Sequence, residues 1–289
     1  MNIVPQLIIN SLIAGSIYSL VALGFNLIYG ATRFFNLAHG IMAASGGYVV
    51  FFGVKTLGWN LYISIILSVF VVGCIGYLLD RFIYKPLRRK KSSNMVMLVA
   101  SLGVFSTIQA LLAILFSTQF HSLRAISPEQ TFNLFGGIIT QTQIIIILVS
   151  LISTISLHLF LSRTRFGKAV KAVSDDEEVS RIVGINTDRI IGATFFIGSS
   201  IAALAGILVG LDTGIEPTIG MSLLLKGVVA AIIGGIGNIF GGTLGAFLLG
   251  FVENFSVWKI SSDWKEAITF TLLVSFLIFR PQGLMNKRK

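Results

Sequence analysis

Long runs of apolar residues without Lys, Arg, Asp or Glu recur along this sequence and limit the folds that it can adopt. A helix needs about 20 largely apolar residues to cross the roughly 30 Å hydrocarbon core of a bilayer. Several runs reach that length, and only 12% of the 289 residues are charged, against about a quarter in a soluble domain. We therefore predict an all-α, polytopic helical bundle, with residues 1–289 forming a single transmembrane domain.

Nine segments are candidate membrane spans. They run from Pro5 to Tyr29, Asn36 to Phe52, Leu61 to Leu79, Met95 to Phe116, Ile144 to Leu161, Ile190 to Leu211, Met221 to Ile236, Ile239 to Phe255 and Glu266 to Phe279. The second, seventh and eighth are short and rich in glycine, so we expect one or more of them to be broken or re-entrant. Eight crossings are therefore the alternative to nine.

The basic residues lie in short clusters between the apolar runs, and their distribution predicts an orientation. With the N-terminus outside, most of the 22 Lys and Arg residues fall in cytoplasmic segments, and nine crossings leave the C-terminus in the cytoplasm. The basic residues placed outside are Lys55, Arg124, Lys259 and Lys265, with Lys226 at the edge of a span. Clusters between apolar runs are typical of loops at a membrane surface, so we expect no nucleic acid partner.

The first span is predicted to be retained, because no Lys or Arg precedes Arg33 and a secretory signal begins with a basic region. Helical spans also indicate an inner or plasma membrane, since outer-membrane proteins are built from alternating β-strands. The single cysteine, Cys74, lies within an apolar run and excludes a disulfide framework.

The loop over residues 162–189 contains the start signal of a short helix. Ser174 followed three residues later by Glu177 has the spacing of a capping box, in which the two side chains satisfy free backbone N–H groups. Asp175 and Asp176 would then lie in the first turn, where carboxylates interact favourably with the positive end of the helix dipole.

Helices commonly end at a glycine in the left-handed conformation, and Gly184 is at a suitable position for this. We therefore predict a helix from Asp175 to Val183. It carries Val179, Ile182 and Val183, and so short a helix is marginal in water unless it packs on something. It packs either on its own bundle or in the groove of another protein.

Four parts of the sequence, in order along the chain, resemble the permeases of branched-chain amino-acid ABC transporters. They are residues 15–30 (GSIYSLVALGFNLIYG) with residues 36–40 (NLAHG), the loop 166–186, the Gly-rich run 234–242 (GGIGNIFGG) and residues 279–283 (FRPQG). One departure is Ile41-Met42, which stands where members of that family commonly carry an acidic residue.

The resemblance implies an importer in which this chain lines the path for a branched-chain or related small amino acid. Its partners would be two cytoplasmic ABC ATPases, a second homologous permease subunit and an extracytoplasmic solute-binding protein. The chain contains no G-x-x-x-x-G-K-[ST] phosphate loop, so we expect the partner subunits to use the ATP, and no cofactor, catalytic site or metal on this chain. The residues implied in coupling are Ser174, Asp175, Asp176, Glu177, Val179, Ile182, Val183 and Gly184.

Polar residues and glycines within the apolar runs are the candidates for the translocation path. They are Asn36, His39, Gly235, Gly237, Asn238 and Gly241. Paired glycines destabilise a helix, so the run 234–242 is predicted to be a break or a tight turn. The alternatives are a histidine hydrogen-bonded within a helix break and asparagines bonded between helices.

Small residues four apart predict close helix packing, with a conduit as the alternative. They include Gly206 with Gly210, and Gly237, Gly241 and Gly245 beside Ala230 and Gly234.

Lys226 and Glu253 are the two charged residues within the short spans, and such charges indicate function by default. They would either reach the outer interface or, if the two spans form a hairpin, pair with each other.

Three other functions are weighed against an amino-acid importer. A permease of the same family for urea or short amides is the first, and the sequence does not separate it from the leading hypothesis. A multispan membrane enzyme requires clustered carboxylates, His or Ser residues at one membrane face, which the sequence lacks apart from residues 175–178. A passive channel would leave the short cytoplasmic helix without a role.

Overall fold

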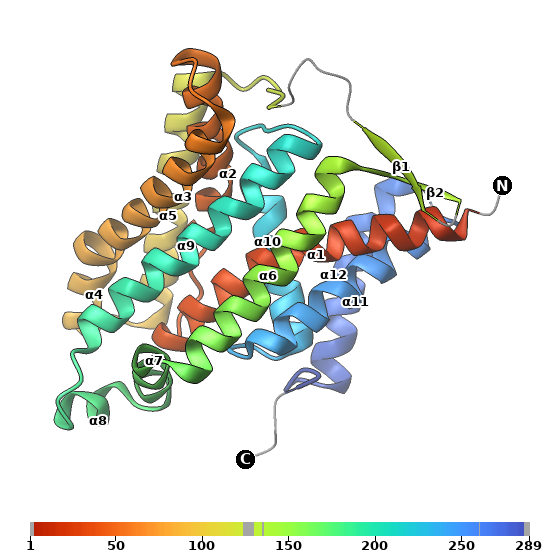
Figure 1. The fold of residues 1–289 in the computed structure, drawn as a ribbon. Helices are drawn as coiled ribbons and strands as arrows, with labels where there is room; N and C mark the ends of the chain where they lie inside the picture. Colours follow the sequence, from red (N-terminus) through yellow and green to blue (C-terminus); the bar gives the residue numbers. More distant parts are fainter. Residues whose placement is uncertain (1–2, 124–129, 135, 260, 286–289) are drawn as a thin grey trace.

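The computed structural model describes residues 3–285 apart from 124–129, 135 and 260. Most of this chain forms a bundle of membrane-length helices (Figure 1). The elements are α1 (Val4–Thr32), α2 (Ala38–Phe51), η1 (Phe52–Thr56), α3 (Leu61–Leu79), η2 (Asp80–Tyr84), α4 (Lys85–Arg89), α5 (Asn94–Phe116), β1 (Thr131–Leu134), β2 (Gly137–Thr140), α6 (Gln141–Arg163), α7 (Arg165–Asp175), α8 (Glu177–Ile182), α9 (Thr187–Asp212), α10 (Ile219–Gly234), α11 (Ile239–Val257), η3 (Ser262–Trp264) and α12 (Lys265–Phe279).

All nine predicted spans coincide with helices, and the predicted membrane bundle is confirmed. Among the described residues, 6 helices are long and apolar enough to cross a membrane: α1, the continuous run α3–η2–α4, α5, α6, α9 and α11. The remaining three, α2, α10 and α12, have 14, 16 and 15 residues. Eight or nine crossings therefore stays a prediction.

A two-stranded antiparallel hairpin adds to the predicted all-α architecture. It joins α5 to α6, with Thr131 of β1 opposite Thr140 of β2. The hairpin is anchored to the start of α1, because the Gln6 amide donates to the Ile138 carbonyl at 3.1 Å and accepts from the Ile138 N–H at 2.8 Å. The hairpin and the first turns of α1 thus lie at the same end of the bundle.

Helices α1 and α9 form the centre of the bundle, and α3, α5 and α6 its periphery. In the most apolar stretch of α1 and of α9, 67% of the residues are buried, whereas in that of α5 only 17% are buried. α1 packs against α9, α10, α11 and α6, whereas α2 fits between α9, α3 and α10. The exposed apolar faces of the peripheral helices are the surfaces suited to lipid.

Small residues bring the helix backbones into contact, as predicted, but Gly237 does not, since a Cβ atom there would meet nothing within 4 Å. A Cβ atom at Gly206 of α9 would lie 1.8 Å from the carbonyl oxygen of Ala43 in α2. Along the α10–α11 hairpin, Cβ atoms at Gly234 and Gly245 would lie 1.8 and 2.1 Å from the carbonyl oxygens of Gly241 and Ala230. These glycines therefore serve packing, which is how apolar helices associate in lipid.

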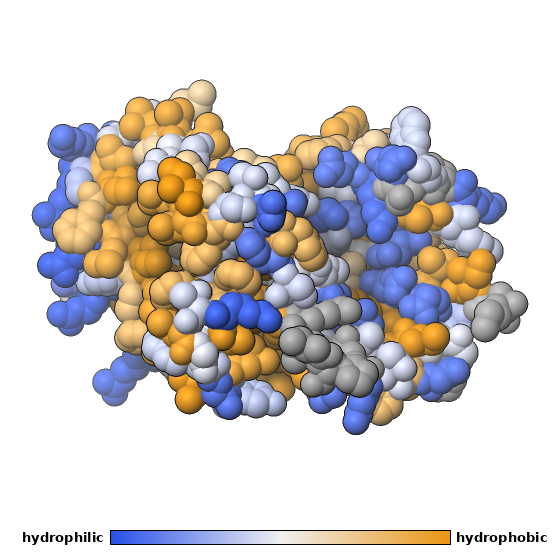
Figure 2. All heavy atoms as spheres, turned by 90° about the horizontal axis from the view of Figure 1, so that it is seen from above, coloured by the Kyte–Doolittle hydropathy of each residue, from blue (hydrophilic) through white to orange (hydrophobic). Residues whose placement is uncertain are grey.

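The bundle has two polar ends separated by a broad apolar area (Figure 2). One, here called the basic end, comprises residues 80–93 and 162–189, where α4, α7 and α8 gather at the lower left of Figure 1. The opposite end, the hairpin end, carries β1 and β2. Successive long helices run in opposite directions between these two ends, so the loops that join them lie at alternate ends.

Candidate functional site

The basic end carries a short helix, α8, that follows the amphipathic helix α7. Thr164 caps α7, accepting a hydrogen bond from the N–H of Gly167 at 3.1 Å. Val170 and Val173 of α7 are buried against the bundle, where α7 packs on α1, α6 and α9. α7 thus holds the following segment against the end of the bundle.

The predicted capping box at Ser174 is wrong, because α7 continues through Asp175. The helical conformation is interrupted only at the next residue, Asp176. Asp176 has extended backbone angles, and its carboxylate accepts the N–H of Val179 at 2.9 Å as the true N-cap of α8. Ser174 instead lies in the last turn of α7, where its carbonyl oxygen accepts Nε and Nη2 of Arg33 at 3.1 and 2.6 Å.

Glu177 is therefore the first residue of α8. Its carboxylate accepts Arg181 Nη2 at 2.6 Å, one turn along the helix, and the Thr187 hydroxyl at 3.3 Å. The predicted end of the helix is confirmed, since Gly184 has a φ of 88° directly after the C-cap Val183. α8 is thus shorter than predicted and is tied to the start of α9.

The apolar side chains of α8 point away from the bundle. The exposed fractions of Val179, Ile182 and Val183 are 53%, 83% and 68%, whereas Ser180 is buried. Apolar side chains so exposed beside a polar surface are typical of a protein interaction site. The predicted alternative in which these three side chains pack on the chain's own bundle is therefore wrong, and docking in the groove of another protein stays a prediction.

The predicted path residues form two groups, each of which contacts a different part of α1. In the first, the Asn36 side chain accepts the Ala38 N–H and the Tyr84 hydroxyl, both at 3.1 Å, just before α2 begins. His39 is fully buried, with Nε2 3.2 Å from the carbonyl oxygen of Val21 in α1. Because that oxygen only accepts, Nε2 carries the proton, and Nδ1 has no hydrogen-bond partner among the described residues.

The second group forms the tight turn between α10 and α11 that the glycine run predicts. Gly235 and Gly237 have φ angles of 109° and 83°, and Asn238 caps α11 by accepting the Gly241 N–H at 3.0 Å. Asn26 of α1 holds the turn, accepting the Gly237 N–H at 2.9 Å and donating to the Asn238 carbonyl at 3.2 Å. The hydrogen bonds of this group do not join it to Asn36 and His39 within the described chain.

Lys226 and Glu253 form an ion pair inside the bundle, as the hairpin alternative predicts. Lys226 Nζ lies 3.6 Å from a carboxylate oxygen of Glu253, whose side chain is only 1% exposed. The Tyr18 hydroxyl donates to Glu253 at 2.7 Å and accepts from Lys226 at 3.0 Å, and the Thr269 hydroxyl donates to the other carboxylate oxygen. The cluster joins α1, α10, α11 and α12 near the middle of α1, so both charges are paired within the bundle.

Sequence reasoning missed the neutral members of these networks. Tyr18 and Thr269 are separated from Glu253 by 235 and 16 residues, and nothing local distinguishes them from other polar residues of apolar helices. A signal did exist for Arg33, which is the first basic residue of the chain and lies next to the end of α1.

Comparisons with known proteins agree over nearly the whole chain. Residues 7–277 match the family described as branched-chain amino acid transport system / permease component. The high-affinity branched-chain amino acid transport system permease protein BraD of Pseudomonas aeruginosa is 32% identical, covering 98% of this chain and 95% of that protein. LivH of Escherichia coli K12, a permease of the same description, is 30% identical with the same coverage.

Among solved structures, PsaBC from Streptococcus pneumoniae in complex with a Fab matches with a TM-score of 0.53. The alignment covers 98% of this chain and 93% of that chain at 13% sequence identity. At that identity the likeness shows a shared fold.

Proposed function

The chain belongs to the branched-chain amino-acid transport permease family, and from this premise we propose that it is the transmembrane subunit of an ABC importer for branched-chain amino acids. Three relatives that it matches over 90% or more of their own length are named as branched-chain amino acid permeases. The proposed permease lies in a bacterial inner membrane with its N-terminus outside, crosses it nine times and ends in the cytoplasm. The alternative of eight crossings would leave the C-terminus outside.

The observation that carries the proposal is the exposed apolar surface of α8 at the basic end. A helix of 6 residues gains little stability from its own hydrogen bonds, so its orientation is set by the Asp176 cap and the Glu177–Arg181–Thr187 network. That network holds α8 in place while leaving Val179, Ile182 and Val183 free. An amphipathic helix presented in this way fits into an apolar groove of a partner.

In the proposed assembly, that partner is a cytoplasmic ABC ATPase. Two ATPases hydrolyse ATP, a second homologous permease completes the membrane pair, and an extracytoplasmic binding protein delivers the solute. Closure of the ATPases moves α8, and α7 transmits the movement to α1, α6 and α9, on which it packs. The residues around Asn36, His39 and the Gly235–Gly241 turn then line or gate the path beside α1.

The test is to replace Val179, Ile182 and Val183 together by Ala in the complete transporter. We expect the variant to insert into the membrane normally but to lose copurification with the ATPases and ATP-dependent uptake of labelled leucine. The matched control replaces Val96, Val99 and Leu102, which are 47%, 56% and 41% exposed on the lipid-facing side of α5.

The control should keep both properties. Retained ATPase binding in the α8 variant would refute the docking role, and uptake of labelled urea in place of leucine would refute the proposed solute.

A further inference from the structure

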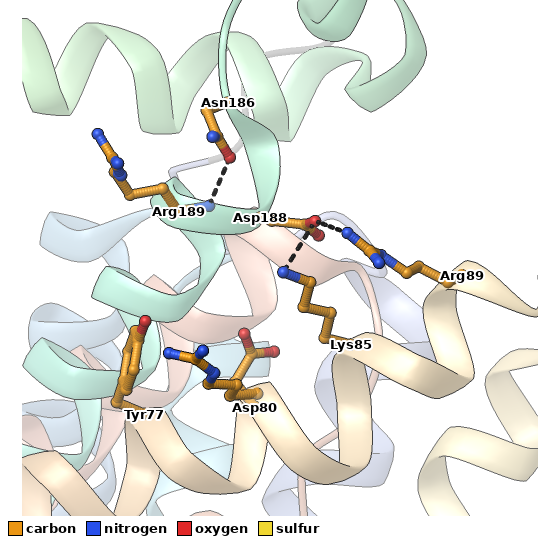
Figure 3. A pocket seen from close by; sticks show the side chains of 8 residues that line it. Tyr77, Asp80, Lys85, Arg89, Asn186, Asp188 and Arg189 are labelled. Carbon is orange, nitrogen blue, oxygen red and sulfur yellow. Dashed lines mark hydrogen bonds and ion pairs between the residues drawn. The ribbon is translucent and has the colours of Figure 1, made fainter.

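A cavity of about 290 Å³ opens at the basic end where η2 and α4 face the start of α9 (Figure 3). Arg81, Lys85 and Arg89 line it from one side, and Arg189, beside Asn186 and Asp188, from the other. Its volume suits a small polar group, and its lining holds four cations against two carboxylates, Asp80 and Asp188.

Both carboxylates of the cavity are already paired. Asp188 lies between Lys85 Nζ at 3.1 Å and Arg89 Nη2 at 2.9 Å, as the dashed lines of Figure 3 show. Asp80, which is 2% exposed, accepts Arg88 Nη1 at 2.6 Å. The cavity therefore keeps an excess of positive charge.

Two of its cations remain free to bind an anion. The side chains of Arg81 and Arg189 are exposed and form no ion pair with any residue in the part of the chain that the structure describes. Guanidinium groups bind phosphate through two parallel N–H donors, so this pair is suited to a phosphodiester.

A second, apolar groove of about 310 Å³ lies farther along the same helix pair. Val69 and Phe70 of α3 and Phe196, Ile197 and Leu204 of α9 line it. The two depressions share one seam, because Gly192 of α9 packs against Tyr77 of α3 between them. From Phe70 to Arg81 the helix rises about 16 Å, which is close to the thickness of one leaflet of the hydrocarbon core.

We propose that this seam binds an anionic phospholipid, with its phosphate between Arg81 and Arg189 and an acyl chain in the groove of Phe70 and Phe196. Positive charge at one end and an apolar groove one leaflet deep are the two chemical halves of such a lipid. The groove lies on an open face of the bundle, since Ile66 and Phe70 on its α3 side are 72% and 59% exposed. A free nucleotide matches the charged cavity but has no apolar part to fill the groove. The inference rests on the proposed orientation, and it does not depend on the transported solute.

The first test compares lipid binding of the purified full-length permease with the double variant Arg81→Gln/Arg189→Gln by native mass spectrometry. We expect the affinity for phosphatidylglycerol to fall about fivefold for each charge removed, roughly 25-fold in all. Phosphatidylcholine binding should stay unchanged, which also shows that the variant is folded. The matched control, Arg163→Gln/Arg165→Gln, removes two exposed arginines from the same end and should bind phosphatidylglycerol as the wild type does.

Equal losses in the two double variants would overturn the proposal in favour of general surface charge. Unchanged phosphatidylglycerol binding accompanied by loss of ATPase copurification would overturn it in favour of a protein contact. Because the assay contains no solute, its failure is distinct from a failure of leucine uptake.

The second test examines the groove. In a background with Trp59, Trp258 and Trp264 replaced by Phe, a tryptophan introduced by Leu204→Trp should be quenched more strongly by brominated phosphatidylglycerol than by brominated phosphatidylcholine. The Arg81→Gln/Arg189→Gln changes should abolish that difference. A tryptophan introduced by Leu102→Trp on α5 should be quenched equally by both lipids, and equal quenching at position 204 would refute the groove assignment.

Discussion

At the scale of single residues, the Lys226–Glu253 pair should contribute strongly to stability. Removing two charges from water costs several kcal/mol, and the pair offsets this only because Tyr18 and Thr269 also bind the carboxylate. Lys226 Nζ further lies 5.1 Å from the centre of the Tyr18 ring, in a cation–π contact. The loss of one partner should therefore cost more than the loss of both.

We expect Lys226→Met to lower the free energy of unfolding by about 3–5 kcal/mol, because Glu253 is then buried without a cation. The double variant Lys226→Met/Glu253→Gln should recover most of that loss. Thermal unfolding of the detergent-solubilised permease measures both. Lys171→Met, which removes an exposed lysine, should have almost no effect, and equal stability of the K226M and K171M variants would contradict the prediction.

The same pair shows what sequence can and cannot predict for a site. Charge in an apolar segment is a local signal, so Lys226 and Glu253 were identifiable, and their contact followed from the glycine turn that makes α10 and α11 a hairpin. Tyr18 belongs to a helix distant in sequence, and its contact depends on how α1 packs against that hairpin. Packing of this kind carries no local pattern.

At the scale of elements, the break between α7 and α8 explains why the predicted cap was displaced by two residues. Ser174 and Asp176 are both suitable N-cap residues. The choice between them is made by the apolar face of α7 and by Arg33, which donates to the carbonyl oxygen of Ser174. That hydrogen bond satisfies an acceptor that the last turn of α7 leaves free, and so stabilises a helix that ends just after Ser174. The existence and the end of the short helix were predictable because Gly184 is a local signal, whereas its start depends on a contact 141 residues away.

We expect Asp176→Ala to loosen α8, whereas Ser174→Ala should leave it intact. In the wild type, the Val179 N–H donates a hydrogen bond to the Asp176 carboxylate at 2.9 Å. Loss of an N-cap costs about 1 kcal/mol, so hydrogen exchange at the Val179 amide should become about fivefold faster. Hydrogen exchange followed by mass spectrometry of the 165–189 peptide measures the change. Faster exchange in the S174A variant, with an unchanged rate in the D176A variant, would show that Ser174 is the N-cap, as the sequence alone predicts.

At the scale of the whole molecule, the loops lie at two ends of the bundle, and the distribution of basic residues assigns each end to one side of the membrane. The hairpin is bonded to the start of α1, and Arg33 at its end is bonded to α7, so these loops lie on opposite sides. Leu284 and Met285 donate to the carbonyl oxygens of Ile233 and Gly234, which places the end of α12 beside the α10–α11 turn. The excess of Lys and Arg at the basic end favours the cytoplasm for that end.

Single cysteines test this arrangement in a Cys74→Ser background, because Cys74 is the one native cysteine. We expect a membrane-impermeant maleimide to label the Thr131→Cys variant in intact spheroplasts. The Glu178→Cys and Gln282→Cys variants should react only after the membrane is opened, since position 178 lies on α8 and position 282 just past the end of α12. All three positions are exposed in the structure, so a missing reaction reports the side of the membrane and not burial. Labelling at position 282 but not 178 in intact cells would indicate an even number of crossings and exclude nine, whereas labelling at 178 alone would reverse the assignment of the coupling helix to the cytoplasm.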